Sequence, residues 1–154
     1  MFLSPDVLSL VETVRTKGYE AGRCQALRAQ LDSFVEGVDQ IGICTTPYAA
    51  NEEATLGLLG PAEDGIWDFR SIKPKPGLRV IGGFACCDFF IALEWAPRSK
   101  PFLDRSPLGP RDSQEWRDII VRAKAHWNRL LQPYVPLFEG FDSHEYVSEN
   151  CHPV

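Results

Sequence analysis

Three apolar segments separated by tight turns constrain the fold of this chain more than any other feature. Residues 66–71 read IWDFRS and alternate as a strand does, and LRVIGGFA (78–85) and FFIALEW (89–95) follow. The linking segments are KPKPG and CCD; proline fixes φ and glycine permits a reversal, so KPKPG is expected to turn the chain. The succession predicts an antiparallel β-meander. The pair Gly82-Gly83 predicts a bulge in its second strand.

An amphipathic helix is expected after the meander. Residues 96–111 contain four prolines and are expected to form a loop. Asp112 is placed as a helix N-cap, and Glu115 completes a capping-box pattern. Apolar residues then recur at spacings of three and four from Trp116 to Leu131, until Pro133 ends the pattern.

The segment before the meander also shows helical spacing. Ser4-Pro5-Asp6 is typical of a helix start, and Gly18 is expected to end the helix that follows. A second helix is expected over 22–37, with Phe34 and Val38 on its apolar face. A short strand at 41–45 and a short helix near 51–58 are expected next.

Helices on the apolar face of a meander predict a two-layer α+β fold. The expected organisation is an N-terminal helical extension (1–20), a central domain (21–132) and an acidic C-terminal tail (133–154).

The charges are unevenly distributed. The net charge of −5 over 154 residues argues against a general nucleic-acid binder, whose affinity comes mainly from phosphate neutralisation. Residues 66–111, however, hold eight cations against four acids. Residues 37–65 and 133–154 hold five and four acids and no cation. We therefore expect a basic centre with acidic flanks, and the tail could cover that centre.

Composition predicts a cytoplasmic protein without a metal or cofactor. No apolar run approaches the roughly 18 residues of a membrane span, and the N-terminus lacks the basic region of a signal peptide. The five cysteines have no framework spacing, which favours reduced thiols. The adjacent Cys86 and Cys87 have a poor geometry for chelation, and Cys151-His152 stands alone.

The segments DGIWDFRS, GLRVIGGF and DFFIALEWAPRSK, followed by an amphipathic helix, resemble the RelE/ParE toxin superfamily, in particular its HigB-like and phage-derived members. The likeness covers residues 21–131. Asp68 stands where the family often has glutamate, and Arg98 and Lys100 stand for its cationic pair. The resemblance implies a cytoplasmic toxin with an antitoxin protein as partner. It also implies cleavage of mRNA on the ribosome by metal-independent attack of a ribose 2′-hydroxyl on the adjacent phosphate.

The resemblance also implies a set of site residues. Four cations would line the RNA-facing side of the sheet and stabilise the phosphorane: Arg70, Arg79, Arg98 and Lys100. His126 is a weaker candidate for the acid or base, and Tyr134 another. Further RNA contacts are expected from Lys73, Lys75, Trp95 and Arg105.

Each of these assignments has a structural alternative. The cations could form a solvated face partnered by Asp68 and Glu94, while His126, Trp95 and Tyr134 simply pack.

Two function classes therefore stay open. One is the endoribonuclease. The other is a non-catalytic binding protein on the same fold, such as a phage-derived accessory protein or an inhibitor of a host protein, and the net charge and the long 101–111 loop favour it. A third possibility is an unrelated small α+β domain.

Overall fold

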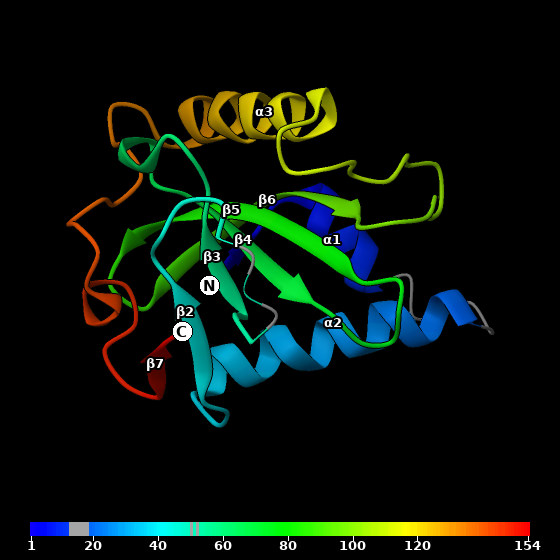
Figure 1. Cartoon of the computed structure of the whole chain (residues 1–154), viewed down its shortest axis with the longest axis horizontal. Helices are drawn as coiled ribbons and strands as arrows, with labels where there is room; N and C mark the ends of the chain where they lie inside the picture. Colours follow the sequence, from blue (N-terminus) through cyan, green and yellow to red (C-terminus); the bar gives the residue numbers. More distant parts are fainter. Residues whose placement is uncertain (13–18, 50, 52) are drawn as a thin grey trace.

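A seven-stranded sheet with helices on both faces forms the protein. The computed structural model describes residues 1–12, 19–49, 51 and 53–154. The strand order is β1-β6-β5-β4-β3-β2-β7 (Figure 1). The strands are β1 (Phe2–Leu3), β2 (Ile41–Cys44), β3 (Leu56–Leu58), β4 (Ile66–Ser71), β5 (Leu78–Cys86), β6 (Phe89–Pro97) and β7 (Cys151–Pro153). The helices are α1 (Pro5–Glu12), α2 (Tyr19–Glu36) and α3 (Gln114–Leu131), with short 3₁₀ turns at Ala62–Asp64 and Ser143–Glu145.

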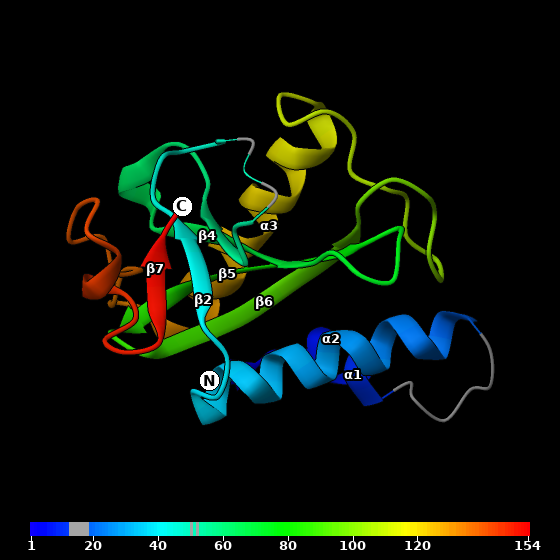
Figure 2. The same cartoon turned by 60° about the horizontal axis from the view of Figure 1, so that its bottom comes forward.

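The predicted α+β class is confirmed, but the sheet is mixed and the layers number three. The central strands β3, β4, β5 and β6 pair antiparallel with one another. The β1–β6, β2–β3 and β2–β7 pairs are parallel. Helices α1 and α2 cover one face and α3 covers the other, where two layers were expected (Figure 2). The short strand expected at 41–45 is β2, whereas the unexpected strands β1, β3 and β7 have two or three residues, too few for a readable alternation.

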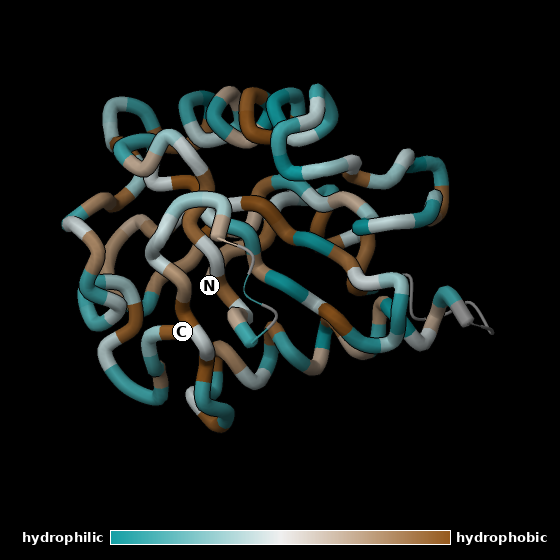
Figure 3. The backbone as a smooth tube through the Cα atoms, in the orientation of Figure 1, coloured by the Kyte–Doolittle hydropathy of each residue, from teal (hydrophilic) through white to brown (hydrophobic). Residues whose placement is uncertain are grey.

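Two hydrophobic cores separate these layers. The core under α1 and α2 is rich in aromatic rings. They include Trp67, Phe69, Phe84, Phe90 and Tyr146. The core under α3 joins Ile66, Ile81 and Leu93 to Trp116 and Trp127. Figure 3 shows the more hydrophobic stretches of the trace along the central strands.

A bulge in the β5–β6 pair shapes the α3 side of the sheet. Ile81 pairs with Glu94 but Gly82 pairs with Ala92, so Leu93 is the extra residue. Leu93 packs under α3, and Glu94 also reaches α3 residues. A register shift does lie at Gly82, where a bulge was predicted, but the extra residue is on β6 and not in the second strand of the meander. A Cβ on Gly82 would lie 1.9 Å from the carbonyl oxygen of Ile91, so the close approach requires glycine.

Several predicted boundaries were wrong. A helix was expected near 51–58, but residues 56–58 form the buried strand β3. The run LGLL (56–59) is too short to show whether its hydrophobic period is that of a helix or of a strand. Ser113 rather than Asp112 is the N-cap of α3. Val38 lies exposed beyond the end of α2. The first helix begins as predicted, and the expected end at Gly18 lies outside the described residues.

Both predicted appendages pack into the same sheet. β1 pairs with β6, and β7 pairs with β2. Tyr146 is completely buried, and its ring lies 4.6 Å from that of Trp67. Segments 1–12 and 133–154 are thus parts of the folded unit. None of the helices in the described portion is both long and apolar enough to cross a membrane.

Candidate functional site

A cleft of about 850 Å³ opens at the end of the sheet where β4 ends and β5 begins. The turn 72–77, the loop 98–111 and the start of α2 border it. Its cationic lining residues are Arg23, Arg70, Lys75, Arg79, Arg98, Lys100 and Arg111. Glu20 is the acidic side chain among the described lining residues. A chain of net charge −5 thus gathers seven cations around one space. We call this space the arginine cleft.

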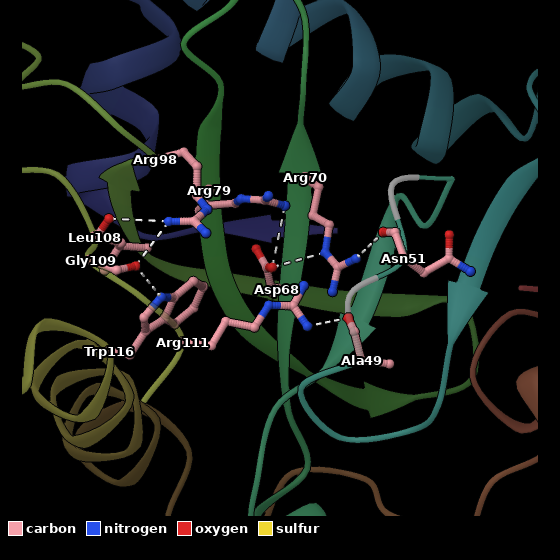
Figure 4. A network of polar contacts seen from close by, with 10 residues as sticks. All are labelled: Ala49, Asn51, Asp68, Arg70, Arg79, Arg98, Leu108, Gly109, Arg111 and Trp116. Carbon is pink, nitrogen blue, oxygen red and sulfur yellow. Dashed lines mark hydrogen bonds and ion pairs between the residues drawn. The ribbon is translucent and has the colours of Figure 1, made fainter. Parts of the chain in front are cut away.

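A buried carboxylate lies beside the arginine cleft. Asp68 is 1% exposed, and its Oδ2 accepts hydrogen bonds from Arg70 Nε at 2.9 Å and Arg79 Nη1 at 3.3 Å (Figure 4). Arg70 is 2% exposed and also donates through Nη1 to the carbonyl oxygen of Asn51 at 2.7 Å. These bonds fix the guanidinium of Arg70.

The sequence builds this arrangement by strand spacing. Asp68 and Arg70 lie two residues apart on β4, so both point to the α3 side. Arg79 is the register partner of Arg70 on β5 and points the same way, as predicted. Gly57 on β3 makes the room, because a Cβ there would lie 1.9 Å from Arg70 Nη2. The position of the Arg70 guanidinium therefore depends on a small residue on the neighbouring strand.

Two further arginines reach the cluster from the loop 98–111. Arg98 Nη1 donates to the carbonyl oxygens of Leu108 at 3.2 Å and Gly109 at 2.9 Å. Arg111 donates to the carbonyl oxygen of Ala49. Trp116 on α3 donates to the same Gly109 oxygen at 3.2 Å. Figure 4 shows the four guanidinium groups arranged around Asp68.

The cluster carries more positive charge than its own carboxylate neutralises. Burial lowers the pKa of Arg79; Asp68 raises it, and Arg70, Arg98 and Arg111 lower it further. Burial also lowers the pKa of Arg111, and the charge of Arg70 adds to that effect. Four arginine side chains surround one aspartate in a partly buried region, so their positive charge is not fully neutralised. This excess charge favours the binding of an anion.

The predicted lysines occupy the rim. Lys75 and Lys100 are exposed and line the arginine cleft. Lys73 is exposed on the same turn as Lys75 but does not line the cleft. The rim therefore adds exposed positive charge to the buried charge below it.

A second polar cluster surrounds Glu94 on the same side of the sheet. His126 Nδ1 lies 2.8 Å from Glu94 Oε1. Arg122 Nε and Arg105 Nη1 lie 3.4 Å and 3.5 Å from Oε2. These residues line a different cavity of about 480 Å³. The structure therefore does not bring His126 or Arg105 together with Arg70 and Arg79.

The aromatic candidates are also placed away from the arginine cleft. Trp95 is 5% exposed, and the guanidinium of Arg105 lies 4.3 Å from its ring centroid. Its ring is therefore covered rather than open to a nucleic-acid base. Tyr134 is exposed after the end of α3, and its carbonyl oxygen accepts a bond from Trp127.

Sequence reasoning missed two arginines of the cleft. Arg111 was counted in the basic centre without a role, although four prolines in its loop suggested a fixed conformation. Arg23 on α2 is 3% exposed, donates to the carbonyl oxygen of Gly77 at 3.1 Å and lies 4.1 Å from the Phe102 ring centroid. No local pattern marks Arg23, because its partners are far away in sequence.

The tail does not cover the basic centre. No residue beyond 132 is among those that line the arginine cleft. The tail instead packs along β2 and the far end of β5, where Leu137 bonds the carbonyl oxygen of Phe84. The masking expected from its acidity is therefore wrong.

Comparisons of the chain with models of known protein families, with curated proteins and with solved structures found no match. In the part of the chain that the structure describes, no group of three or more His, Cys, Asp or Glu residues is placed to hold a metal ion. The chemistry of the arginine cleft is the binding of oxyanions through charged donors.

Proposed function

We propose that this protein is a non-catalytic binding protein that holds an anionic partner in the arginine cleft. One observation carries the proposal: four guanidinium groups surround a single buried carboxylate and are fixed by hydrogen bonds to it and to backbone carbonyls. Fixed donors lose little conformational entropy when a ligand binds. Their surplus charge provides both affinity and steering of an anion.

Binding fits the geometry better than cleavage does. Attack by a 2′-hydroxyl needs a group to accept its proton and another to protonate the leaving oxygen. Asp68 is 1% exposed and accepts bonds from two arginines through Oδ2, and His126 contacts Glu94 in the other cavity. The described lining of the arginine cleft then leaves Glu20, an exposed side chain on α2, as its titratable carboxylate.

The endoribonuclease of a toxin–antitoxin pair is the second candidate. What supports it is the guanidinium cluster, because such donors also stabilise a phosphorane. Kinship with the RelE/ParE superfamily, an antitoxin partner and mRNA on the ribosome as substrate belong to this proposal.

A binding and cleavage assay on the full chain separates the two. A fluorescent single-stranded RNA and a fluorescent polyglutamate peptide are titrated at low salt, and the RNA is then run on a denaturing gel. We expect at least one probe to bind. Its affinity should fall as the salt concentration rises and should also fall in the Arg79→Gln variant, while the RNA stays intact.

Arg129→Gln is the matched control. Arg129 is exposed on α3 and does not line the arginine cleft, so the same charge change should leave binding unaltered. RNA cut to 2′,3′-cyclic phosphate ends by the wild type but not by Arg79→Gln would overturn the proposal in favour of the nuclease. Failure of both probes to bind would also overturn it.

A further inference from the structure

The base of the arginine cleft has the donor geometry of a phosphate site. A guanidinium carries five N–H donors. Arg79 bonds Asp68 through Nη1, and its Nε is buried without a partner among the described residues. Arg70 bonds through Nε and Nη1, while its Nη2 packs over Gly57. Asp68 Oδ1 is likewise buried without a hydrogen-bond partner among the described residues. The four guanidinium groups together still carry more N–H donors than this one carboxylate can accept.

The directions of these donors favour a tetrahedral anion over a planar one. Arg70 comes from β4, Arg79 from β5, and Arg98 and Arg111 from the loop 98–111 (Figure 4). Donors from three elements can each meet a different oxygen of a phosphate, whereas a carboxylate presents two oxygens in one plane. A phosphate monoester, with a charge of about −1.5 to −2 at neutral pH, also offsets more of the surplus than a carboxylate.

The rim offers a second place for negative charge. Lys75 on the turn 72–77 and Lys100 on the loop 98–111 both line the cleft. The backbone N–H of Arg98 donates to the carbonyl oxygen of Gly77 at 2.9 Å, and this bond holds the turn and the loop together. Lysine is a mobile point charge that can follow a second phosphate without fixed geometry. A base with fixed guanidinium groups and a rim with exposed lysines suit a ligand with two phosphate groups.

The surroundings favour a small ligand over a nucleic-acid strand. The volume of about 850 Å³ falls within the roughly 300–1,000 Å³ that small-molecule sites occupy. Phe102, the aromatic residue in the described lining, is 2% exposed and lies under Arg23, so no open ring is offered to a base.

We infer that the arginine cleft binds a small molecule carrying at least two phosphate groups, one held by Arg70, Arg79 and Arg111 and the other by Lys75 and Lys100. This inference rests on the proposed function and names its ligand class.

Calorimetric titration of the full chain tests it, with pyrophosphate, inorganic phosphate and citrate as probes at constant ionic strength. Pyrophosphate is expected to bind most tightly. Arg79→Gln should weaken pyrophosphate binding by about tenfold or more, because a charged donor is lost. Lys100→Gln should weaken pyrophosphate by about threefold and leave phosphate unchanged, because an exposed charge contributes less. Lys100 is exposed, so this variant keeps the test valid if Arg79→Gln misfolds.

Arg129→Gln is again the control and should bind all three probes as the wild type does. Citrate binding as tightly as pyrophosphate, and depending equally on Arg79, would overturn the phosphate inference while leaving an anion-binding function intact. A short RNA that binds the arginine cleft far more tightly than pyrophosphate would overturn the small-ligand inference in the same way. No binding by any anion would overturn the inference and the proposed function together.

Discussion

Two buried carboxylates on the α3 side of the sheet both contact cationic side chains, but the exposure of those side chains to solvent differs. Glu94 on β6 contacts Arg105, Arg122 and His126, whose side chains are 28%, 53% and 27% exposed. Asp68 on β4 contacts Arg70 and Arg79, which are 2% and 14% exposed, with Arg98 and Arg111 nearby. One carboxylate is therefore surrounded by hydrated partners and the other by dehydrated ones.

The difference shows how a structural ion cluster can be told from a binding site. The partners of Glu94 come from α3 and the loop 98–111, so this cluster links the helix and the loop to β6. Its partly exposed cations are solvated by water, which screens their charge. The Asp68 cluster has an excess of fixed cations and opens on the arginine cleft. The cavity beside Glu94 also contains Asp6, Glu115 and Asp118, and Arg105 pairs with Asp6 at 3.0 Å. Charge balance and hydration, rather than the presence of arginine and carboxylate, therefore separate the two.

The largest effect is expected from breaking the Asp68 cluster. Arg70→Ala leaves a fully buried carboxylate with one partner, and we expect a loss of about 3–5 kcal/mol in the free energy of unfolding, measured by urea denaturation. Arg28→Ala is the control, because its pair with Asp32 at 3.6 Å is exposed and should cost less than about 1 kcal/mol. Equal losses in the two variants would show that burial of the Asp68 pair has no special role.

A smaller loss is expected from Gly57→Ala. The new Cβ would overlap the Arg70 guanidinium and force it to shift, at a cost of about 1–3 kcal/mol in the free energy of unfolding. Gly22→Ala provides a control of opposite sign, because no atom beyond the adjacent helix backbone lies within 4 Å of a Cβ there and alanine favours a helix by about 1 kcal/mol. Thermal unfolding of both variants checks the pair, and a stable Gly57→Ala protein would contradict the packing of Arg70.

The smallest loss is expected at the other cluster. Glu94→Gln keeps the side-chain shape and frees partners that water already reaches, so we expect about 1–2 kcal/mol lost in the free energy of unfolding and no change in anion binding. Urea denaturation and pyrophosphate titration measure the two quantities. Weaker pyrophosphate binding in this variant would contradict the separation of the two clusters.

The predictable part of the fold is the part with long, periodic elements. Alternation, turns and spacing predicted strands at 66–71, 78–85 and 89–95 and an apolar helix stripe from Trp116 to Leu131, which correspond to β4, β5, β6 and α3. β1, β3 and β7 have two or three residues, and their pairing depends on long-range contacts that no local pattern encodes. The parallel pairs of the sheet were missed for that reason.

The predictable part of the site is the pair on adjacent strands. Strand periodicity placed Arg70 and Arg79 on one face. Spacing could not show that Arg23 and Arg111 reach the same space, because they lie on segments that only the tertiary fold brings together. Nor could spacing show that His126 contacts Glu94, since the position of a residue on a helix does not reveal which cavity its side chain lines.

The most direct measurement compares pyrophosphate binding by Arg79→Gln and Arg122→Gln, two identical changes of charge, one in each cluster. We predict that Arg79→Gln weakens binding by about tenfold or more, through the loss of a charged donor. We predict that Arg122→Gln stays within about twofold of the wild type, because an exposed charge outside the cleft is screened. Equal weakening in both variants, or a larger effect of Arg122→Gln, would contradict the assignment of anion binding to the Asp68 cluster.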